Sequence, residues 1–273
     1  MNYVAKIIAV ANQKGGVGKT TTSVNLAACL AEAGKKVLLV DCDPQGNASS
    51  GYGIDKSALD TTIYQVIIEG TPVEQAIVHT DFQVDVLPAN IELAGAEVEL
   101  VAAISRETRL KRALDTVADT YDVILIDCPP SLGLLTLNSL AAADSVLMPI
   151  QCEFYALEGV SQLMNTIELV RTNLNARLEV EGVLMTMYDG RTRLAEQVVA
   201  EVRENFGELV YQTMIPRTVR LSEAPSYGEP IIYYDKRSKG AETYRQLAKE
   251  VMAHGKERSW RPWQGLGGSA QGS

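Results

Sequence analysis

The chain has 273 residues, of which 46% are hydrophobic and 22% charged, and its formal net charge is −9. This composition is typical of a soluble globular protein, and the length is sufficient for one large domain with a substantial core. The negative charge excludes a protein coated in basic residues for nucleic acid, but it leaves room for a local basic patch.

Two further features predict a cytoplasmic protein without a membrane span. No apolar run approaches the roughly 18 residues that a membrane span needs, and the N-terminus leads directly into a strand without the pattern of a signal peptide. The four cysteines, Cys29, Cys42, Cys128 and Cys152, show no CxxC spacing. They therefore indicate neither a disulfide framework nor a cysteine metal site, and a reducing compartment fits best.

The first predicted elements are an apolar strand that ends near Val10 and a helix that begins near Thr20, joined by the turn in VANQKGGVGKTT. Glycines let consecutive backbone N–H groups face a phosphate, and the helix N-terminus adds partial positive charge. Lys19 would reach the β- and γ-phosphates, and the Thr20 hydroxyl would ligate Mg²⁺. We expect a nucleotide site rather than a chance match, formed by Lys14, Gly15, Gly16, Val17, Gly18, Lys19, Thr20 and Thr21.

The remaining elements alternate between strands and helices. Strands are predicted at the start of VLLVDCDPQGNAS and of YDVILIDCPPSLG and over 84–87, 144–151 and 180–187; helical patterns occupy 60–69, 91–118, 157–172, 191–205 and the residues after 238. This βαβ alternation predicts an α/β fold of the P-loop NTPase type, with a mostly parallel twisted sheet and helices on both faces. We assign residues 1–254 to one domain and the Gly-, Ser- and Gln-rich residues 255–273 to a disordered tail.

Two carboxylates follow predicted strands, at the edge of the sheet where α/β proteins bind ligands. Asp127 ends the apolar stretch VILID, as the Walker B aspartate that holds Mg²⁺ does. The alternative for Asp127 is a turn or helix-capping role before the two prolines. Asp43 lies in DCDPQGN and could orient the water that hydrolysis requires, or it could cap the turn before Pro44. Asp41 is assigned to a structural or metal-shell role.

The phosphate loop departs from the ordinary P-loop pattern in two places: Gln13 stands where glycine is usual, and a second lysine, Lys14, enters the loop. KGGVGKTT thereby resembles the deviant Walker A loop of the ParA/MinD group of P-loop ATPases. Four later segments resemble the chromosomal Soj branch of the ParA proteins: CPPSLGLLTLNSL (128–140), CEFYALEGVSQL (152–163), GVLMTMYDGRT (182–192) and IPRTVRLSEAPSYGEPI (215–231). The resemblance covers residues 4 to 253.

The resemblance implies ATP and ADP as nucleotides, Mg²⁺ as the metal ion, and several residue roles. Lys14 would cross a dimer interface to the partner's nucleotide; a solvated loop lysine is the alternative. Asp43 would position the attacking water, and Pro216 would lie against the adenine. Members of the group often have asparagine two residues after this proline. Here the residue is Thr218, so the resemblance does not imply a contact between that side chain and the base.

The resemblance also implies partners. Arg191 and Arg220 match positions associated with non-specific binding of double-stranded DNA, and exposed arginines suit phosphate contacts; ordinary solvated arginines are the alternative. An ATP-bound homodimer would join two modest basic patches into one surface. The expected protein is a nucleoid-associated partitioning ATPase that hydrolyses ATP weakly alone and is stimulated by a ParB-type protein carrying a short basic segment.

Three other classes of P-loop protein compete with this interpretation. A MinD-like ATPase at a membrane surface would need a basic amphipathic C-terminal helix, where this chain has Gly, Ser and Gln. An iron–sulfur ATPase would need paired cysteines in glycine-rich settings, which Cys128 and Cys152 do not occupy. A metabolic kinase would need an acceptor-binding motif and a lid, and neither is recognisable.

Overall fold

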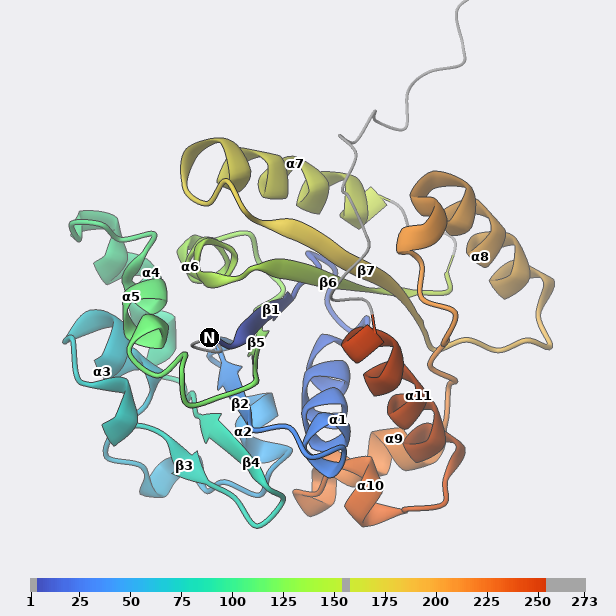
Figure 1. The fold of residues 1–273 in the computed structure, drawn as a ribbon, viewed down its shortest axis with the longest axis horizontal. Helices are drawn as coiled ribbons and strands as arrows, with labels where there is room; N and C mark the ends of the chain where they lie inside the picture. Colours follow the sequence, from blue (N-terminus) through green and yellow to red (C-terminus); the bar gives the residue numbers. More distant parts are fainter. Residues whose placement is uncertain (1–3, 154–157, 254–273) are drawn as a thin grey trace, which may run out of the picture.

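A computed structural model describes residues 4–153 and 158–253 of the chain. Its centre is a seven-stranded sheet in the order β3-β4-β2-β5-β1-β6-β7 (Figure 1). The strands are β1 (Lys6–Val10), β2 (Val37–Asp41), β3 (Val78–His79), β4 (Val84–Leu87), β5 (Val123–Asp127), β6 (Ser145–Gln151) and β7 (Glu179–Thr186). Every neighbouring pair is parallel except β3 with β4. The carboxyl ends of β1, β2 and β5 therefore meet at one edge.

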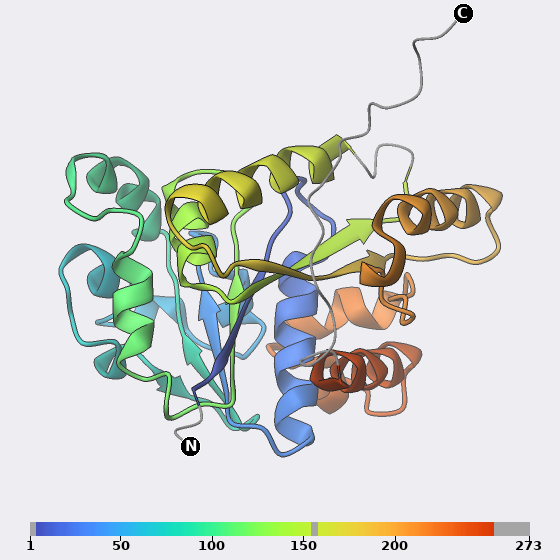
Figure 2. The ribbon, with the colours of Figure 1, turned by 45° about the horizontal axis from the view of Figure 1, so that its top comes forward.

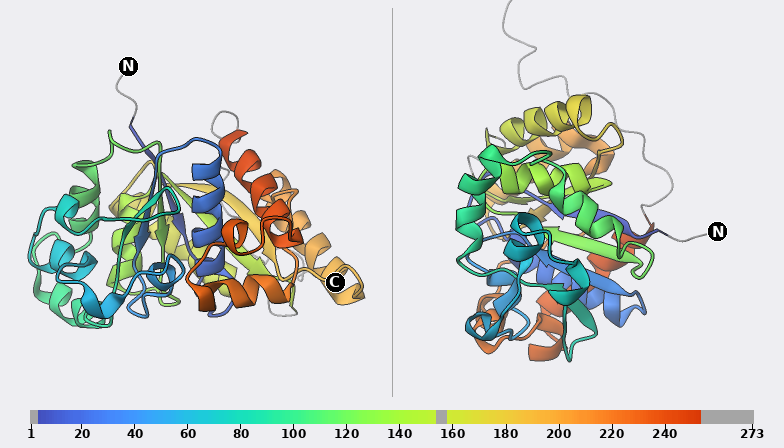
Figure 3. Two further views of the ribbon diagram at one scale, coloured as in Figure 1. Left: turned by 90° about the horizontal axis from the view of Figure 1, so that it is seen from below. Right: turned by 90° about the vertical axis from the view of Figure 1, so that its left-hand side faces the viewer.

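Helices cover both faces of the sheet (Figure 3). One core lies under α1 (Lys19–Glu32), α10 (Ile231–Tyr234) and α11 (Lys239–Ala253), together with the short α2 (Asn47–Ser50) and α9 (Val219–Glu223). The opposite core lies under α3 (Ile63–Ile68), α4 (Leu93–Glu99), α5 (Arg109–Asp115), α6 (Leu134–Ala142), α7 (Glu158–Asn173) and α8 (Arg193–Phe206). Because both faces are covered, the central strands are mostly apolar, and β2 and β5 each end in an aspartate at the carboxyl edge of the sheet.

The predicted α/β architecture is confirmed. The sequence patterns do not predict the short helices α2, α9 and α10, and three further segments also differ. The helical pattern over 91–118 is not one helix: α4 continues into a 3₁₀ turn over Leu100–Ala102, and Ser105 then takes a left-handed φ of 51° before α5 begins. The antiparallel edge strand β3 has two residues, too few to give an alternating pattern. Helix α6 begins after the turn that follows Asp127, in a segment for which the sequence patterns predict no element.

Two sequence expectations concern the C-terminal end and the membrane. The predicted tail over 255–273 lies outside the described residues. Within the described part of the chain, no helix combines the length and the apolar character that crossing a membrane requires.

Candidate functional site

The phosphate loop joins β1 to α1, as the strand–turn–helix pattern predicts. Gly16 and Gly18 have φ values of 73° and 86°, in the left-handed region that side-chain-bearing residues rarely adopt. Gly18 is the residue that precedes the first turn of α1, and it carries no side-chain cap. The N–H groups of that turn consequently remain available to an anion at the positive end of the helix.

The loop is held by hydrogen bonds to two neighbouring strands, β6 and β7. Asn12 donates its amide to the carbonyl of Pro149 at 2.7 Å and accepts the N–H of Lys14 at 2.9 Å. Thr186, at the end of β7, donates its hydroxyl to the carbonyl of Val17 at 2.8 Å. These bonds fix the loop against β6 and β7, on one side of β1, so its shape is set before any ligand binds.

The two lysines of the loop differ in their surroundings. Lys19 is only 7% exposed and donates to the carbonyl of Lys14 at 3.1 Å. Burial lowers the pKa of Lys19, although the nearby charges of Asp127 and Asp43 oppose that shift. The Lys14 ammonium instead lies 3.6 Å from the Glu153 carboxylate at the surface. Lys19 is thus a buried cation at the loop, and Lys14 is a half-exposed one at its rim.

Asp127 forms the floor of the site. Its two carboxylate oxygens accept hydrogen bonds from the Thr20 hydroxyl at 2.7 Å and from the Ser23 hydroxyl at 2.8 Å. Burial, and next the charge of Asp41, raise the pKa of Asp127 to about 7. A carboxylate and a hydroxyl side by side are the two protein oxygens that Mg²⁺ takes when phosphates and water complete its shell.

The donor set therefore fits a magnesium ion bound together with a nucleotide. Among the described residues, no group of three or more His, Cys, Asp or Glu side chains is arranged to hold a metal ion alone. Mg²⁺ commonly binds through one or two carboxylates together with substrate oxygens, and Asp127 with the adjacent Thr20 hydroxyl supplies protein oxygens of that kind.

Asp41 lies beside Asp127 because β2 and β5 pair in register at these two residues. It is fully buried and accepts the backbone N–H and the hydroxyl of Ser49, both at 2.8 Å, and the N–H of Asp43 at 3.2 Å. Burial raises the pKa of Asp41 to about 6 despite these bonds. These hydrogen bonds tie Asp41 to the segment that follows β2, and the structural or metal-shell role expected for it stays a prediction.

Asp43 occupies the turn after β2 and is only partly buried. Its carboxylate accepts the N–H of Gln45 at 2.9 Å, so the turn-capping role left open by the sequence is present. The same carboxylate lies close enough to Lys19 and Asp127 to affect their pKa values. Capping the turn fixes the carboxylate at the rim of the phosphate site, and the two roles are therefore compatible.

Pro216 faces the loop from the other end of the chain. A cavity of about 500 Å³ is lined by Gly18 and Thr21 on one side and by Pro216 and Thr218 on the other. Thr21 and Pro216, both expected at the nucleotide, therefore share one cavity beside the phosphate loop. Its size suits a planar ring system in contact with the pyrrolidine ring.

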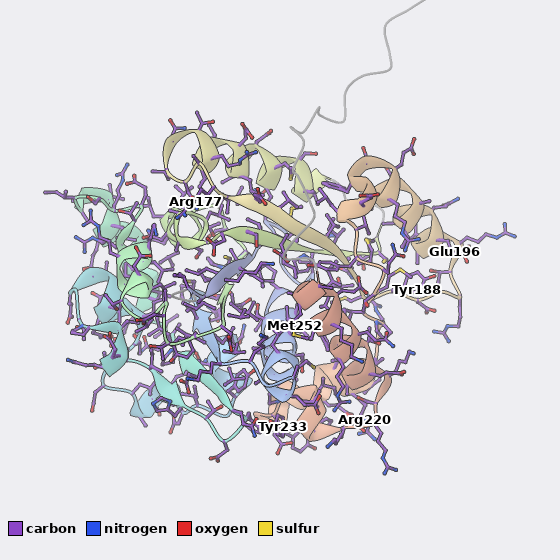
Figure 4. All side chains as sticks on the ribbon, viewed as in Figure 1. Arg177, Tyr188, Glu196, Arg220, Tyr233 and Met252 are labelled. Atoms are coloured by element: carbon purple, nitrogen blue, oxygen red, sulfur yellow. The ribbon has the colours of Figure 1, made fainter. Side chains whose placement is uncertain are left out.

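Arg191 and Arg220 lie outside this cavity. The Arg191 side chain is 90% exposed and forms a paired contact with Asp189, at 2.8 and 2.7 Å. Arg220 lies 3.1 Å from Glu223 and 3.5 Å from Asp235. Figure 4 shows Arg220 on the side of the molecule formed by α9, α10 and α11.

Four residues of the site are not indicated by the sequence patterns. Asn12, Ser23 and Thr186 act through bonds to residues distant in the chain, and Glu153 pairs with Lys14. The position of Asn12 within the phosphate-loop stretch and of Ser23 just after it could have drawn attention to these two, whereas Thr186 and Glu153 have no such signal.

Comparisons with known proteins agree with this geometry. A family model described as an AAA domain matches residues 5–180. The chain is 62% identical to the sporulation initiation inhibitor protein Soj of Bacillus subtilis over 253 residues, 92% of this chain and 100% of that protein. It is 56% identical to the chromosome partitioning protein ParA of Myxococcus xanthus over 250 residues, 91% and 88% of the two chains.

A solved structure gives the same result for the fold. The Mycobacterium smegmatis protein described as cobyrinic acid a,c-diamide synthase with bound ADP and magnesium superposes with a TM-score of 0.82 at 43% identity, covering 92% of this chain and 95% of that one. The chain belongs to the Soj/ParA family of chromosome-partitioning ATPases.

Proposed function

We propose that the chain binds ATP with Mg²⁺ at the loop of residues 11–21, dimerises around the nucleotide, holds double-stranded DNA without sequence preference in that state, and releases it on hydrolysis. The observation that carries the proposal is the Thr20–Asp127 hydrogen bond at 2.7 Å beside the buried Lys19. It brings the expected metal ligands and the expected phosphate ligand to one point of the sheet edge.

Each residue of the site has one task in this proposal. The backbone N–H groups of the loop and Lys19 bind the phosphates, because they are fixed donors in a partly dry site. Thr20 and Asp127 hold Mg²⁺, which neutralises phosphate charge when it is bound. Asp43 orients the attacking water, and its bond to the N–H of Gln45 fixes the carboxylate. Pro216 packs against the base.

Lys14 is assigned to the partner subunit's nucleotide. It lies at the rim of the loop, half-exposed, and its ammonium is 3.6 Å from Glu153 in the single chain. An exposed ion pair of this kind contributes little, typically about 0–1 kcal/mol. A phosphate of higher charge can therefore take the lysine from Glu153 when two chains meet.

DNA binding is assigned to Arg191, in the loop before α8, and to Arg220 of α9. One chain offers few phosphate contacts, in keeping with its net charge of −9. A dimer doubles the contacts, and counterion release makes affinity grow steeply with each added phosphate. Nucleotide state then controls DNA binding through the oligomeric state. A ParB-type protein with a basic segment would accelerate hydrolysis, and the protein would be cytoplasmic and nucleoid-associated.

The test is binding to random-sequence duplex DNA at low and moderate salt, with no nucleotide, with ADP and with ATP and Mg²⁺. The oligomeric state is measured in the same buffers by light scattering. We expect DNA binding only with ATP, in a dimer, weakened by salt and lost in Arg191→Glu. Binding by a monomer in ATP would refute the dimer switch, and no binding in any state would remove DNA from the proposal.

A further inference from the structure

The buried side chain of Asn25 joins α1 to the segment that carries Arg220. Asn25 is only 4% exposed. Its amide donates to the carbonyl of Thr21 at 2.7 Å, and its amide oxygen accepts the backbone N–H of Ile231, also at 2.7 Å. A buried amide whose two ends are both bonded holds its neighbours in one arrangement. Asn25 is therefore a fixed link between elements that lie 206 positions apart in the chain.

One end of this link lies at the nucleotide site. Thr21, whose carbonyl bonds to Asn25, lines the cavity that also contains Pro216. The residue before it, Thr20, is the expected magnesium ligand, and both belong to the first turn of α1. A nucleotide that fixes this turn consequently fixes the carbonyl that orients the Asn25 side chain.

The other end lies one helical turn from the groups that hold Arg220. Ile231 is the first residue of α10, which has four residues and ends at Tyr234. The Tyr234 hydroxyl donates to the Glu223 carboxylate at 3.1 Å. The Arg220 guanidinium lies 3.1 Å from the same carboxylate and 3.5 Å from Asp235, which follows α10. Because α10 is a single turn, a displacement at its first N–H also moves the groups at its end that contact Arg220.

Residues 219–235, here called the Arg220 arm, have room to move relative to α1. Figures 1 and 2 show α10 beside α1. Between the arm and α1 lies a cavity of about 360 Å³, whose walls include Asn25 on one side and Ala224 and Pro225 on the other. Close-packed contacts resist displacement, whereas a cavity permits a small one. The bond from Asn25 to the arm therefore has a displacement to control.

We propose that Asn25 is a positioning residue for DNA binding, which makes the position of Arg220 depend on whether nucleotide is bound. This inference rests on the proposed function, which assigns Arg220 to DNA. In that proposal nucleotide acts by pairing two chains, and the link through Asn25 adds a second effect within each chain. Bound nucleotide fixes the first turn of α1, and Asn25 then fixes the Arg220 arm.

The first test measures this effect in a single chain. Backbone hydrogen exchange of the wild-type chain is followed by mass spectrometry without nucleotide and with ADP and Mg²⁺, and light scattering verifies that the chain is monomeric in both buffers. We expect ADP to slow exchange in peptides that cover α10, which lies outside the nucleotide cavity, because local opening becomes rarer when the arm is held. The slowing should disappear in Asn25→Ala. Unchanged exchange of α10 with ADP would refute the inference and leave the proposed function intact.

The second test compares Asn25→Ala with a matched control, Asn138→Ala. Asn138 is also buried, donates to the carbonyl four residues earlier at 2.9 Å, and accepts the N–H of Leu110 from another helix at 3.2 Å. It belongs to α6, on the opposite face of the sheet from α10. ATP affinity, dimer content with ATP and binding to a random duplex are measured in both variants. We expect Asn25→Ala to bind ATP and dimerise normally but to lose DNA affinity by about tenfold or more, a usual size for coupling between two sites. Asn138→Ala should bind DNA normally.

A conservative variant tests which bond carries the effect. Asn25→Asp keeps the shape of asparagine, and its side-chain oxygen still accepts the N–H of Ile231 whether or not the carboxyl is protonated. It should therefore bind DNA more tightly than Asn25→Ala. Equal loss of DNA affinity in the alanine and aspartate variants would refute the role of the bond to Ile231.

The remaining outcomes also decide the inference. Equal loss of DNA affinity in Asn25→Ala and Asn138→Ala would assign the loss to general destabilisation and refute the positioning role. Failure of Asn25→Ala to dimerise with ATP would place the effect of Asn25 on the dimer instead of on Arg220. A wild-type chain that binds no DNA in any nucleotide state would refute the proposed function, and the exchange measurement would still show whether nucleotide and arm are coupled.

Discussion

The Thr20 hydroxyl donates to the Asp127 carboxylate at 2.7 Å across 107 positions of the chain. This bond follows from the topology, because β1 and β5 pair in register and α1 begins where β1 and the phosphate loop end. The same two oxygens are the expected protein ligands of Mg²⁺. The bond therefore orients both ligands before nucleotide arrives.

Thr20→Val should test this arrangement, since valine keeps the shape of threonine and removes the hydroxyl. We expect Mg²⁺-dependent affinity for a non-hydrolysable ATP analogue to fall by about ten- to a hundredfold, the value of roughly 1.5–3 kcal/mol for a bond to a charged group. Calorimetric titration with and without Mg²⁺ measures it. Thr20→Ser, which keeps the hydroxyl, is the control and should bind normally; equal weakening in both variants would contradict the ligand role.

The two roles of Asp43 can be separated by two substitutions. Asparagine can still accept the N–H of Gln45, whereas alanine cannot. If Asp43 positions the water, both Asp43→Asn and Asp43→Ala should keep ATP binding and lose hydrolysis by at least about 100-fold. Steady-state phosphate release and nucleotide binding are measured side by side. Normal hydrolysis in the asparagine variant would leave Asp43 with the turn-capping role alone.

The buried carboxylate pair makes the stability of the nucleotide-free protein depend on pH. The folded-state pKa values of about 7 for Asp127 and about 6 for Asp41 lie above the ordinary 3.8. Between these limits the folded chain binds more protons than the unfolded chain, so the free energy of unfolding contributed by the pair falls as pH rises. This contribution is complete below about pH 4 and disappears as pH passes the folded values.

Thermal unfolding from pH 5 to pH 8, with a chelator present, checks this direction. Asp127→Asn should be more stable than the wild type at pH 8 and should show a much weaker pH dependence, because it removes a charge that burial penalises. Asp81→Asn, at an exposed carboxylate, is the control and should follow the wild type. The same slope in Asp127→Asn and the wild type would assign the pH dependence to other groups.

Whether a feature of this site could be predicted from the sequence depends on how far apart in the chain the residues that form it lie. The strand–turn–helix at Lys19 and the aspartate that ends β5 are local patterns, and the parallel sheet brings their ends together. The bonds from Asn12 to Pro149 and from Thr186 to Val17 join segments whose proximity only the fold creates. The break after α4 could not be predicted from the sequence, because a serine does not indicate the left-handed backbone conformation that Ser105 adopts.

The ion pair between Arg191 and Asp189 gives the last prediction. The pair is bidentate, and the arginine holds the pKa of Asp189 down to about 2. A phosphate must compete with this carboxylate for the guanidinium. Asp189→Asn should therefore tighten ATP-dependent DNA binding, whereas Arg191→Ala should weaken it and reduce the salt slope by about 0.9 for each DNA phosphate that the variant no longer neutralises.

Binding to a random duplex is measured over a salt series at saturating ATP, with equal dimer content verified in each variant. Arg112→Ala, at an exposed arginine of α5, is the control and should keep the wild-type slope, since α5 lies at the opposite end of the molecule from α8 (Figure 1). A slope that changes equally in Arg112→Ala and Arg191→Ala would mean that net charge, rather than this surface, controls DNA binding. Weaker binding by Asp189→Asn would mean that Asp189 orients Arg191 toward the phosphate instead of competing with it.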